Sequence, residues 1–98
     1  MKLAVLMSDY RGGLDMIDRL SADSLGVILV GNGVYHAAEK ESGKTSSLLD
    51  KKANFYALTE DFETRGITAA NLDSRVKAVN YGDLVDLIFN DYEKVIWI

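Results

Sequence analysis

The chain has 98 residues, of which 48% are hydrophobic and 27% are charged, and its formal net charge is −4. This length and balance predict one globular domain over residues 1–98, and the acidic balance argues against direct binding to nucleic acid, which needs clustered Lys and Arg. Cysteine is absent, which excludes a disulfide, a thiolate metal site and a cysteine nucleophile.

The first apolar run is short. It holds five residues, Leu3–Met7, between Lys2 and Ser8. A signal peptide needs about 7–15 apolar residues and a membrane-spanning helix about 20. We therefore expect a cytoplasmic protein with no membrane association.

The first half of the chain predicts two strand–helix units. Leu3–Met7 is an apolar strand, and after a loop the three-residue spacing of Leu14, Ile17 and Leu20 predicts a helix. Gly26–Val30 is a second apolar strand, which enters Gly31-Asn32-Gly33 and then a predicted helix from Val34 to about Glu41. We interpret the Gly-Asn-Gly segment as a tight turn, in which glycine permits positive φ and Asn32 tolerates left-handed geometry.

The middle of the chain predicts a surface loop and a third unit. Ser42–Ser47 has the composition of a mobile loop, and Leu48–Lys52 that of a short amphipathic turn. Ala53–Leu58 is a third strand, and Thr59 is expected to cap a short helix over Glu60–Arg65 that ends at Gly66.

The last third predicts two more strands around one helix. After a further turn at Thr68–Leu72, Val76–Val79 is the fourth strand. Asn80 and Asp83 have the spacing of a capping box before a helix over Gly82–Asn90. Lys94–Ile98 closes the chain as a fifth strand and a natural sheet edge. Trp97 on this strand is either an interface anchor or a residue that packs on a helix.

Strands that alternate with helices predict an α/β fold with a parallel sheet covered on both faces and right-handed crossovers. In such a sheet the residues that follow each strand share one rim, where ligands and partners bind. Ser8 and Asn80 belong to this predicted rim. The further candidate rim or interface residues are Asp9, Tyr10, Asn32, His36, Asp61, Tyr81 and Trp97.

Three other patterns indicate structure more than chemistry. Gly43-Lys44-Thr45 follows a predicted helix and has Ala38 where a phosphate-binding loop needs its first glycine. His36 stands where a dinucleotide fingerprint needs its third glycine, and as the sole histidine it makes no metal site. We expect His36 to be a partly exposed structural or interface residue. Glu60 and Asp61 are expected to offset the dipole of their helix.

Three segments together resemble the DsrH/TusB family, within the wider DsrE/F/H-like group. They are Ile28–Ala37, Phe55–Ile67 and Val79–Leu87, followed by a last strand that carries Trp97. The resemblance implies a three-layer α/β/α domain with a five-stranded parallel sheet. It also implies a subunit of a sulfur-transfer complex with DsrE/TusD-like and DsrF/TusC-like partners, which forms a homo-oligomer when isolated.

In that family a cysteine persulfide on the DsrE/TusD-like subunit carries the sulfur. The TusB branch serves 2-thiolation of the tRNA wobble uridine, and the DsrH branch serves dissimilatory sulfur oxidation. Some DsrH members also carry a cysteine in the first helix, but the matching segment here, Leu14–Leu20, has none. A persulfide needs a thiolate. We therefore expect a non-catalytic subunit without a cofactor.

Two rival interpretations remain at this point. One is a stand-alone homo-oligomeric binding module that has left the relay. The other is a small hydrolase or nucleotide-binding enzyme that uses the strand-end rim.

Overall fold

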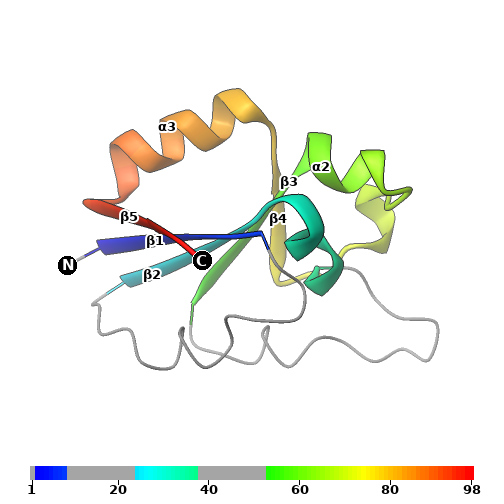
Figure 1. Cartoon of the computed structure of the whole chain (residues 1–98), viewed down its shortest axis with the longest axis horizontal. Coiled ribbons are helices and arrows are strands. Elements are labelled where there is room, and N and C mark those ends of the chain that lie inside the picture. Colours follow the sequence, from blue (N-terminus) through cyan, green and yellow to red (C-terminus); the bar gives the residue numbers. More distant parts are fainter. Residues whose placement is uncertain (1, 9–23, 38–52) are drawn as a thin grey trace.

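The computed structural model describes residues 2–8, 24–37 and 53–98 (Figure 1). The predicted helix over Leu14–Leu20 and the predicted loop and turn over 42–52 lie outside the described residues. The elements follow the chain in this order: β1 (Lys2–Met7), β2 (Ser24–Leu29), the 3-10 helix η1 (Gly31–His36), β3 (Asn54–Leu58), α2 (Thr59–Thr64), the 3-10 turn η3 (Ala69–Asn71), β4 (Val76–Val79), α3 (Tyr81–Asp91) and β5 (Lys94–Trp97).

The described strands form one five-stranded sheet in the order β4-β3-β2-β1-β5. Every neighbouring pair is parallel, which confirms the predicted α/β fold. The prediction that the fifth strand lies at an edge is also confirmed. β4 forms the opposite edge, so the first strand of the chain lies inside the sheet, between β2 and β5.

Alternate residues of the strands enter two apolar clusters, one on each face of the sheet. On one face Val27, Leu29 and Phe55 pack with Phe62 of α2. On the other face the sheet residues pack against α3, which lies across that side in Figure 1. The main members of this second cluster are Ala4, Ile28, Val30, Leu58, Leu84, Leu87 and Ile88. Each large apolar side chain buried in this way stabilises the fold by about 1.5–3 kcal/mol.

The turn after β2 differs from the prediction. The chain becomes helical at Gly31, three residues before the predicted start at Val34, and its first turns are 3-10 rather than α. Gly31 has a φ of 53°, which lets the strand turn at once. At Gly33 a Cβ would lie 2.2 Å from the carbonyl oxygen of Met7, so only glycine fits there. Asn32 does not have a positive φ, contrary to the prediction.

The start of α2 also differs in detail. Leu58, the last residue of β3, is the N-cap residue, and no side chain caps the helix. The predicted Thr59 cap is therefore wrong, because Thr59 is already the first residue of the helix. The predicted end is confirmed: Gly66 has a φ of 75° and its N–H donates to the carbonyl of Glu63 at 3.0 Å.

The capping box of α3 is confirmed. The Asn80 side chain accepts the N–H of Asp83 at 2.8 Å, and the Asp83 carboxylate accepts the N–H of Asn80 at 3.4 Å. The helix therefore begins at Tyr81, beside the rim, and runs back across the sheet. Beyond its end Tyr92 lies directly over Gly26, where a Cβ would be 2.1 Å from the Tyr92 hydroxyl.

Candidate functional site

The carboxyl ends of the strands surround a hollow of about 300 Å³. We call it the rim hollow. Its floor and walls are mostly apolar, and its lining comes from β1, η1, β3, α2, α3 and β5 and from the residues that directly follow β1 and β2. The lining residues are Leu6, Ser8, Val30, Gly31, Leu58, Asp61, Tyr81, Leu84 and Trp97. The predicted rim therefore exists, and it brings together Ser8, Asp61, Tyr81 and Trp97.

Asp61 joins α2 to the first residue of η1 at the rim. Its carboxylate accepts the N–H of Gly31 at 2.7 Å, so a side chain of α2 satisfies the first backbone donor of η1. Arg65 donates to the carbonyl of Asp61 at 2.9 Å and to the side chain of Asn32 at 3.1 Å. Asp61 thus has a partner on a neighbouring turn, beyond the predicted role of offsetting its own helix dipole.

Two strand ends meet at the other side of the rim hollow. The N–H and hydroxyl of Ser8 lie 3.3 and 3.4 Å from the carbonyl of Ile98 and donate to it, which joins the ends of β1 and β5. Tyr81 and Trp97 form exposed walls, with 55% and 66% of their surfaces accessible. Trp97 is therefore not covered by a helix of the described residues, and the interpretation that it merely packs on one is not supported.

The remaining predicted site residues do not join the rim hollow. His36 is only 4% exposed, so the expectation of a partly exposed histidine is wrong. The physical reason is the 3-10 turn, in which residues three apart share a side. Gly33 contacts the end of β1, and His36 lies on that same inner side. Asn32 is exposed beside Arg65. Asp9 and Tyr10 lie outside the described residues.

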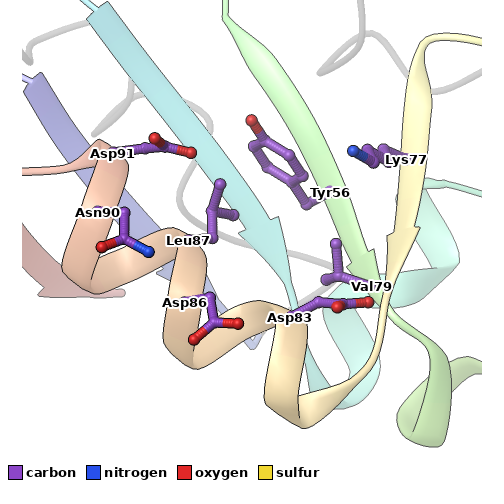
Figure 2. A pocket seen from close by; sticks show the side chains of 8 residues that line it. All are labelled: Tyr56, Lys77, Val79, Asp83, Asp86, Leu87, Asn90 and Asp91. Carbon is purple, nitrogen blue, oxygen red and sulfur yellow. The ribbon is translucent and has the colours of Figure 1, made fainter.

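Sequence reasoning missed a second hollow, of about 340 Å³, between α3 and the edge strand β4. Figure 2 shows polar side chains of α3 on one wall, facing Tyr56 of β3 and Lys77 of β4. We call it the β4-edge hollow. Its lining residues are Tyr56, Lys77, Val79, Asp83, Asp86, Leu87, Asn90 and Asp91. The available signal was the spacing of Asp83, Asp86 and Asn90, which places polar groups on one helical face.

Two titratable groups, Tyr92 beyond the end of α3 and Asp73 before β4, have shifted pKa values. Burial, followed by a side-chain hydrogen bond with Tyr56, raises the pKa of Tyr92. The Asp73 carboxylate accepts the N–H and the guanidinium of Arg75 at 2.9 to 3.0 Å, and these bonds lower its pKa. The Asp73 N–H also donates to the carbonyl of Ala37 at 2.8 Å, so this residue ties the entry of β4 to the end of η1.

The lining of the rim hollow is therefore mostly apolar. Asp61, the only carboxylate among the lining residues that the structure describes, already accepts a backbone N–H. Within residues 2–8, 24–37 and 53–98, no three His, Cys, Asp or Glu side chains gather where they could hold a metal ion. In the same residues, no helix has the length and apolar character needed to cross a membrane.

Comparisons with known proteins agree with the resemblance seen in the sequence. Residues 7–94 match the family described as "DsrH like protein". The chain is 28% identical over 90 residues to Protein TusB of Photorhabdus laumondii, covering 92% of this chain and 93% of that protein. It is also 28% identical over 97 residues to Protein TusB of Yersinia pestis, covering 99% and 100% of the two chains.

Two solved structures share the fold. Protein MTH1491 from Methanobacterium thermoautotrophicum, described as of unknown function, superposes with a TM-score of 0.69 at 17% identity, and each chain is covered completely. Protein Tm0979 from Thermotoga maritima superposes with a TM-score of 0.61 at 23% identity, covering 90% of this chain and 93% of the other. At these identities the likeness establishes the fold alone.

Proposed function

The chain belongs to the DsrH-like protein family, and we propose that it is a non-catalytic subunit of a cytoplasmic sulfur-relay complex that serves 2-thiolation of the tRNA wobble uridine. One observation carries the proposal. The family match spans residues 7–94, its TusB relatives align over nearly their full length, and yet the chain has no cysteine. The sulfur must then be held by a thiolate on a partner subunit.

The rim hollow supports a role in binding that partner. Its apolar lining and its exposed Tyr81 and Trp97 walls suit an apolar side chain or loop of another subunit. Asp61 fixes the turn at Gly31 from the neighbouring helix, so the hollow is preorganised. A thiolate covered at such a surface would be protected from water and from side reactions. In this proposal the partners are DsrE/TusD-like and DsrF/TusC-like subunits.

The test is co-expression of the full chain with the cysteine-bearing DsrE-like and the DsrF-like subunits from the same genome, followed by native mass determination. We expect a mixed complex that contains the cysteine-bearing subunit. In strains that lack the chain, 2-thiouridine in tRNA should fall and should return on complementation. A chain that ignores both subunits, or unchanged 2-thiouridine, would overturn the proposal. Unchanged 2-thiouridine with loss of sulfur oxidation would assign the complex to the Dsr-type pathway.

A matched pair of tyrosines tests the rim hollow within this proposal. Tyr81 lines the hollow, whereas Tyr35 is an exposed tyrosine of η1 that does not. Tyr81→Ala should weaken binding of the cysteine-bearing subunit by about tenfold or more, since an aromatic anchor typically contributes at least 1–2 kcal/mol. Tyr35→Ala should leave binding unchanged. Equal effects of the two variants would remove the hollow from the interface.

A separate experiment tests the proposal that this chain does not itself carry sulfur. The pure chain, incubated with a persulfide donor, should acquire no stable covalent sulfur by mass spectrometry. The DsrE-like subunit serves as the positive control under the same conditions. Stable sulfur on this chain would contradict the assignment as a non-carrier.

A second candidate, a stand-alone binding module, is favoured by one observation, the apolar lining of the rim hollow. In that case the chain would assemble only with itself and would bind a small apolar ligand. A homo-oligomer that recruits neither sister subunit in the co-expression experiment would support this alternative.

A further inference from the structure

Asn32 and Gly33 form the only Asn-Gly pair of the chain. In such a pair the backbone nitrogen of the glycine can attack the side-chain carbonyl carbon of the asparagine, because glycine has no Cβ to hinder the approach. The other asparagines are each followed by a larger residue, namely Phe55, Leu72, Tyr81 and Asp91. In an unfolded chain, Asn32 is therefore the asparagine that would lose its side-chain amide first.

This reaction is a deamidation, which consumes water and releases ammonia. The Gly33 nitrogen loses its proton and bonds to Cγ of Asn32, and the bond from Cγ to the side-chain nitrogen breaks. That nitrogen takes up the proton and leaves as ammonia, and a five-membered succinimide ring remains. Water then opens the ring at either carbonyl. One product is aspartate, and the other is isoaspartate, in which the backbone runs through Cβ and Cγ.

The folded chain opposes the attack at the nitrogen of Gly33. Its N–H donates to the carbonyl of Val30 at 2.9 Å, so the proton that must leave is held in a hydrogen bond. Gly33 is buried, and a Cβ built on it would lie 2.2 Å from the carbonyl oxygen of Met7. The backbone of Gly33 is thus packed against the end of β1. The nitrogen cannot move toward the side chain of Asn32 without breaking these contacts.

The fold also restrains the side chain of Asn32, although this residue is exposed. Its amide oxygen accepts the Nε–H of Arg65 at 3.1 Å, and Arg65 is itself held by a 2.9 Å bond to the carbonyl of Asp61. Ring closure requires Cβ of Asn32 to eclipse the Gly33 nitrogen about the Cα–C bond. Asn32 belongs to η1, and the ψ of about −20 to −30° that is typical of a 3-10 helix keeps these two atoms apart.

We propose that Asn32-Gly33 is a deamidation site that the folded η1 turn keeps unreactive, so that the reaction takes place only when η1 opens. This inference does not depend on the proposed sulfur-relay role. Exposure of Asn32 to water would favour the reaction, and the protection comes from the hydrogen bonds and from the packing of Gly33. Arg65 of the neighbouring α2 segment supplies the part of this protection that a substitution can remove.

The two products differ in how they fit the folded chain. Aspartate keeps the backbone unchanged and offers the guanidinium of Arg65 a carboxylate in place of an amide. Isoaspartate lengthens the backbone between Gly31 and Gly33, which are fixed by Asp61 and by the packing against Met7. These contacts cannot both persist, so η1 does not re-form and Gly31 is displaced from the rim hollow. Isoaspartate therefore makes the opening of η1 permanent.

The first test compares the full chain in its folded state and in urea at the same mildly alkaline pH, which favours loss of the Gly33 proton. Peptide mapping by mass spectrometry measures conversion at every asparagine. We expect Asn32 to be the fastest in urea and to react about tenfold or more slowly in the folded chain, because hydrogen bonds and packing must break first. The other asparagines serve as internal controls. Equal rates at Asn32 in the two states would overturn the proposal.

A second test removes the contact with Arg65. Arg65→Ala should raise the rate at Asn32 in the folded chain by about threefold or more, and Arg65→Lys, which keeps a donor, should lie between this variant and the wild type. Glu63→Ala, which changes an exposed side chain of the same helix, is the matched control and should leave the rate unchanged. In urea all four chains should react alike. Circular dichroism checks that each is folded, and an unchanged rate in folded Arg65→Ala would contradict the protective role of Arg65.

A third test examines the products, which ion exchange separates from the parent chain by their additional negative charge. Amide hydrogen exchange at Gly31 and Gly33 should be faster in the isoaspartate form than in the parent chain. The directly made variant Asn32→Asp should keep exchange rates close to those of the wild type. An isoaspartate form with native exchange rates at both glycines would show that η1 re-forms, against the proposal.

Discussion

The two edges of the sheet present opposite chemistry to their surroundings. At the β4 edge, Lys77 faces polar groups of α3 across the β4-edge hollow, and Arg75 precedes the strand with its guanidinium bound to Asp73. At the β5 edge, the strand and the adjoining helix expose Val95, Trp97 and apolar side chains of α3. Charges on an edge strand discourage pairing with other chains. Each edge strand carries one lysine, Lys77 in β4 and Lys94 in β5, so the two edges differ in the exposed apolar surface beside the strand and not in the charge of the strand itself.

The largest effect is expected from a change that makes the β4 edge as apolar as the β5 edge. The double change Lys77→Val and Ala78→Val removes the edge charge and adds β-branched residues. We expect assemblies larger than the wild-type species, growing with concentration, because an edge strand without a charge is open to pairing with another chain. Light scattering measures the mass. An unchanged mass would show that the charge at Lys77 is not what protects this edge.

The helix that separates the two edges depends on Gly26. Gly26→Val would collide with Tyr92 and displace the residue that anchors the end of α3, so we expect a loss of about 2–4 kcal/mol in unfolding free energy. The matched control is Gly82→Ala in the first turn of α3, where a Cβ meets only Asn80 Oδ1 at 3.4 Å. That change should be neutral or stabilising by up to about 1 kcal/mol. Chemical denaturation measures both, and equal losses would refute the anchoring role of Tyr92.

The two hollows differ in the contribution that their carboxylates make to stability. Asp61→Ala at the rim hollow removes the acceptor of the Gly31 N–H and should cost about 1–2 kcal/mol of unfolding free energy. Asp86→Ala at the β4-edge hollow removes an exposed carboxylate and should change stability by less than about 0.5 kcal/mol. Thermal or urea denaturation distinguishes them. A larger effect at Asp86 would mean that the β4-edge hollow is the structured one.

The smallest effects concern the dependence of stability on pH, and they come from Asp73 and Tyr92. The folded-state pKa of Asp73 is lowered by Arg75, so its stabilising contribution is present above its unfolded pKa of about 3.9 and is lost as pH falls through the lower folded value. Urea titrations at acidic pH should show a shallower dependence for Asp73→Asn. An identical acid profile for variant and wild type would exclude this contribution.

The stability that Tyr92 contributes depends on pH in the opposite direction to that of Asp73. Burial raises the folded-state pKa of Tyr92, so its contribution is complete below the unfolded pKa of about 10 and is lost as pH rises toward the folded value. Tyr92→Phe should therefore flatten the alkaline limb of the stability profile. A wild-type limb that matches the variant's would place the alkaline transition elsewhere.

The sequence predicted the strands well because each is a compact apolar run. It also predicted the edge position of β5, the capping box at Asn80 and the stop at Gly66, which rest on local chemistry. The errors at Thr59 and His36 both concern the residue at which a helix begins. At His36 that point depends on residues far apart in the sequence, because Gly33 packs against the carbonyl of Met7.

The candidate site was predicted in part for the same reason. The rim follows from the parallel topology, so Ser8, Asp61, Tyr81 and Trp97 could be placed together in advance. The bond from Asp61 to Gly31 spans 30 positions in the sequence and could not be read from local spacing. The β4-edge hollow was missed because it requires knowing that α3 leaves part of β4 uncovered.

The position of β1 inside the sheet has a consequence for how the molecule forms. Lys2 and Glu93, 91 positions apart, are hydrogen-bonded where β1 meets the start of β5. A contact between such distant positions closes a long loop and is therefore slow. During synthesis β1, β2, β3 and β4 can associate before residues 94–97 leave the ribosome. Until then the backbone groups of β1 that later pair with β5 have no partner strand. The β5 edge of the described sheet therefore forms only after the other four strands have been synthesised.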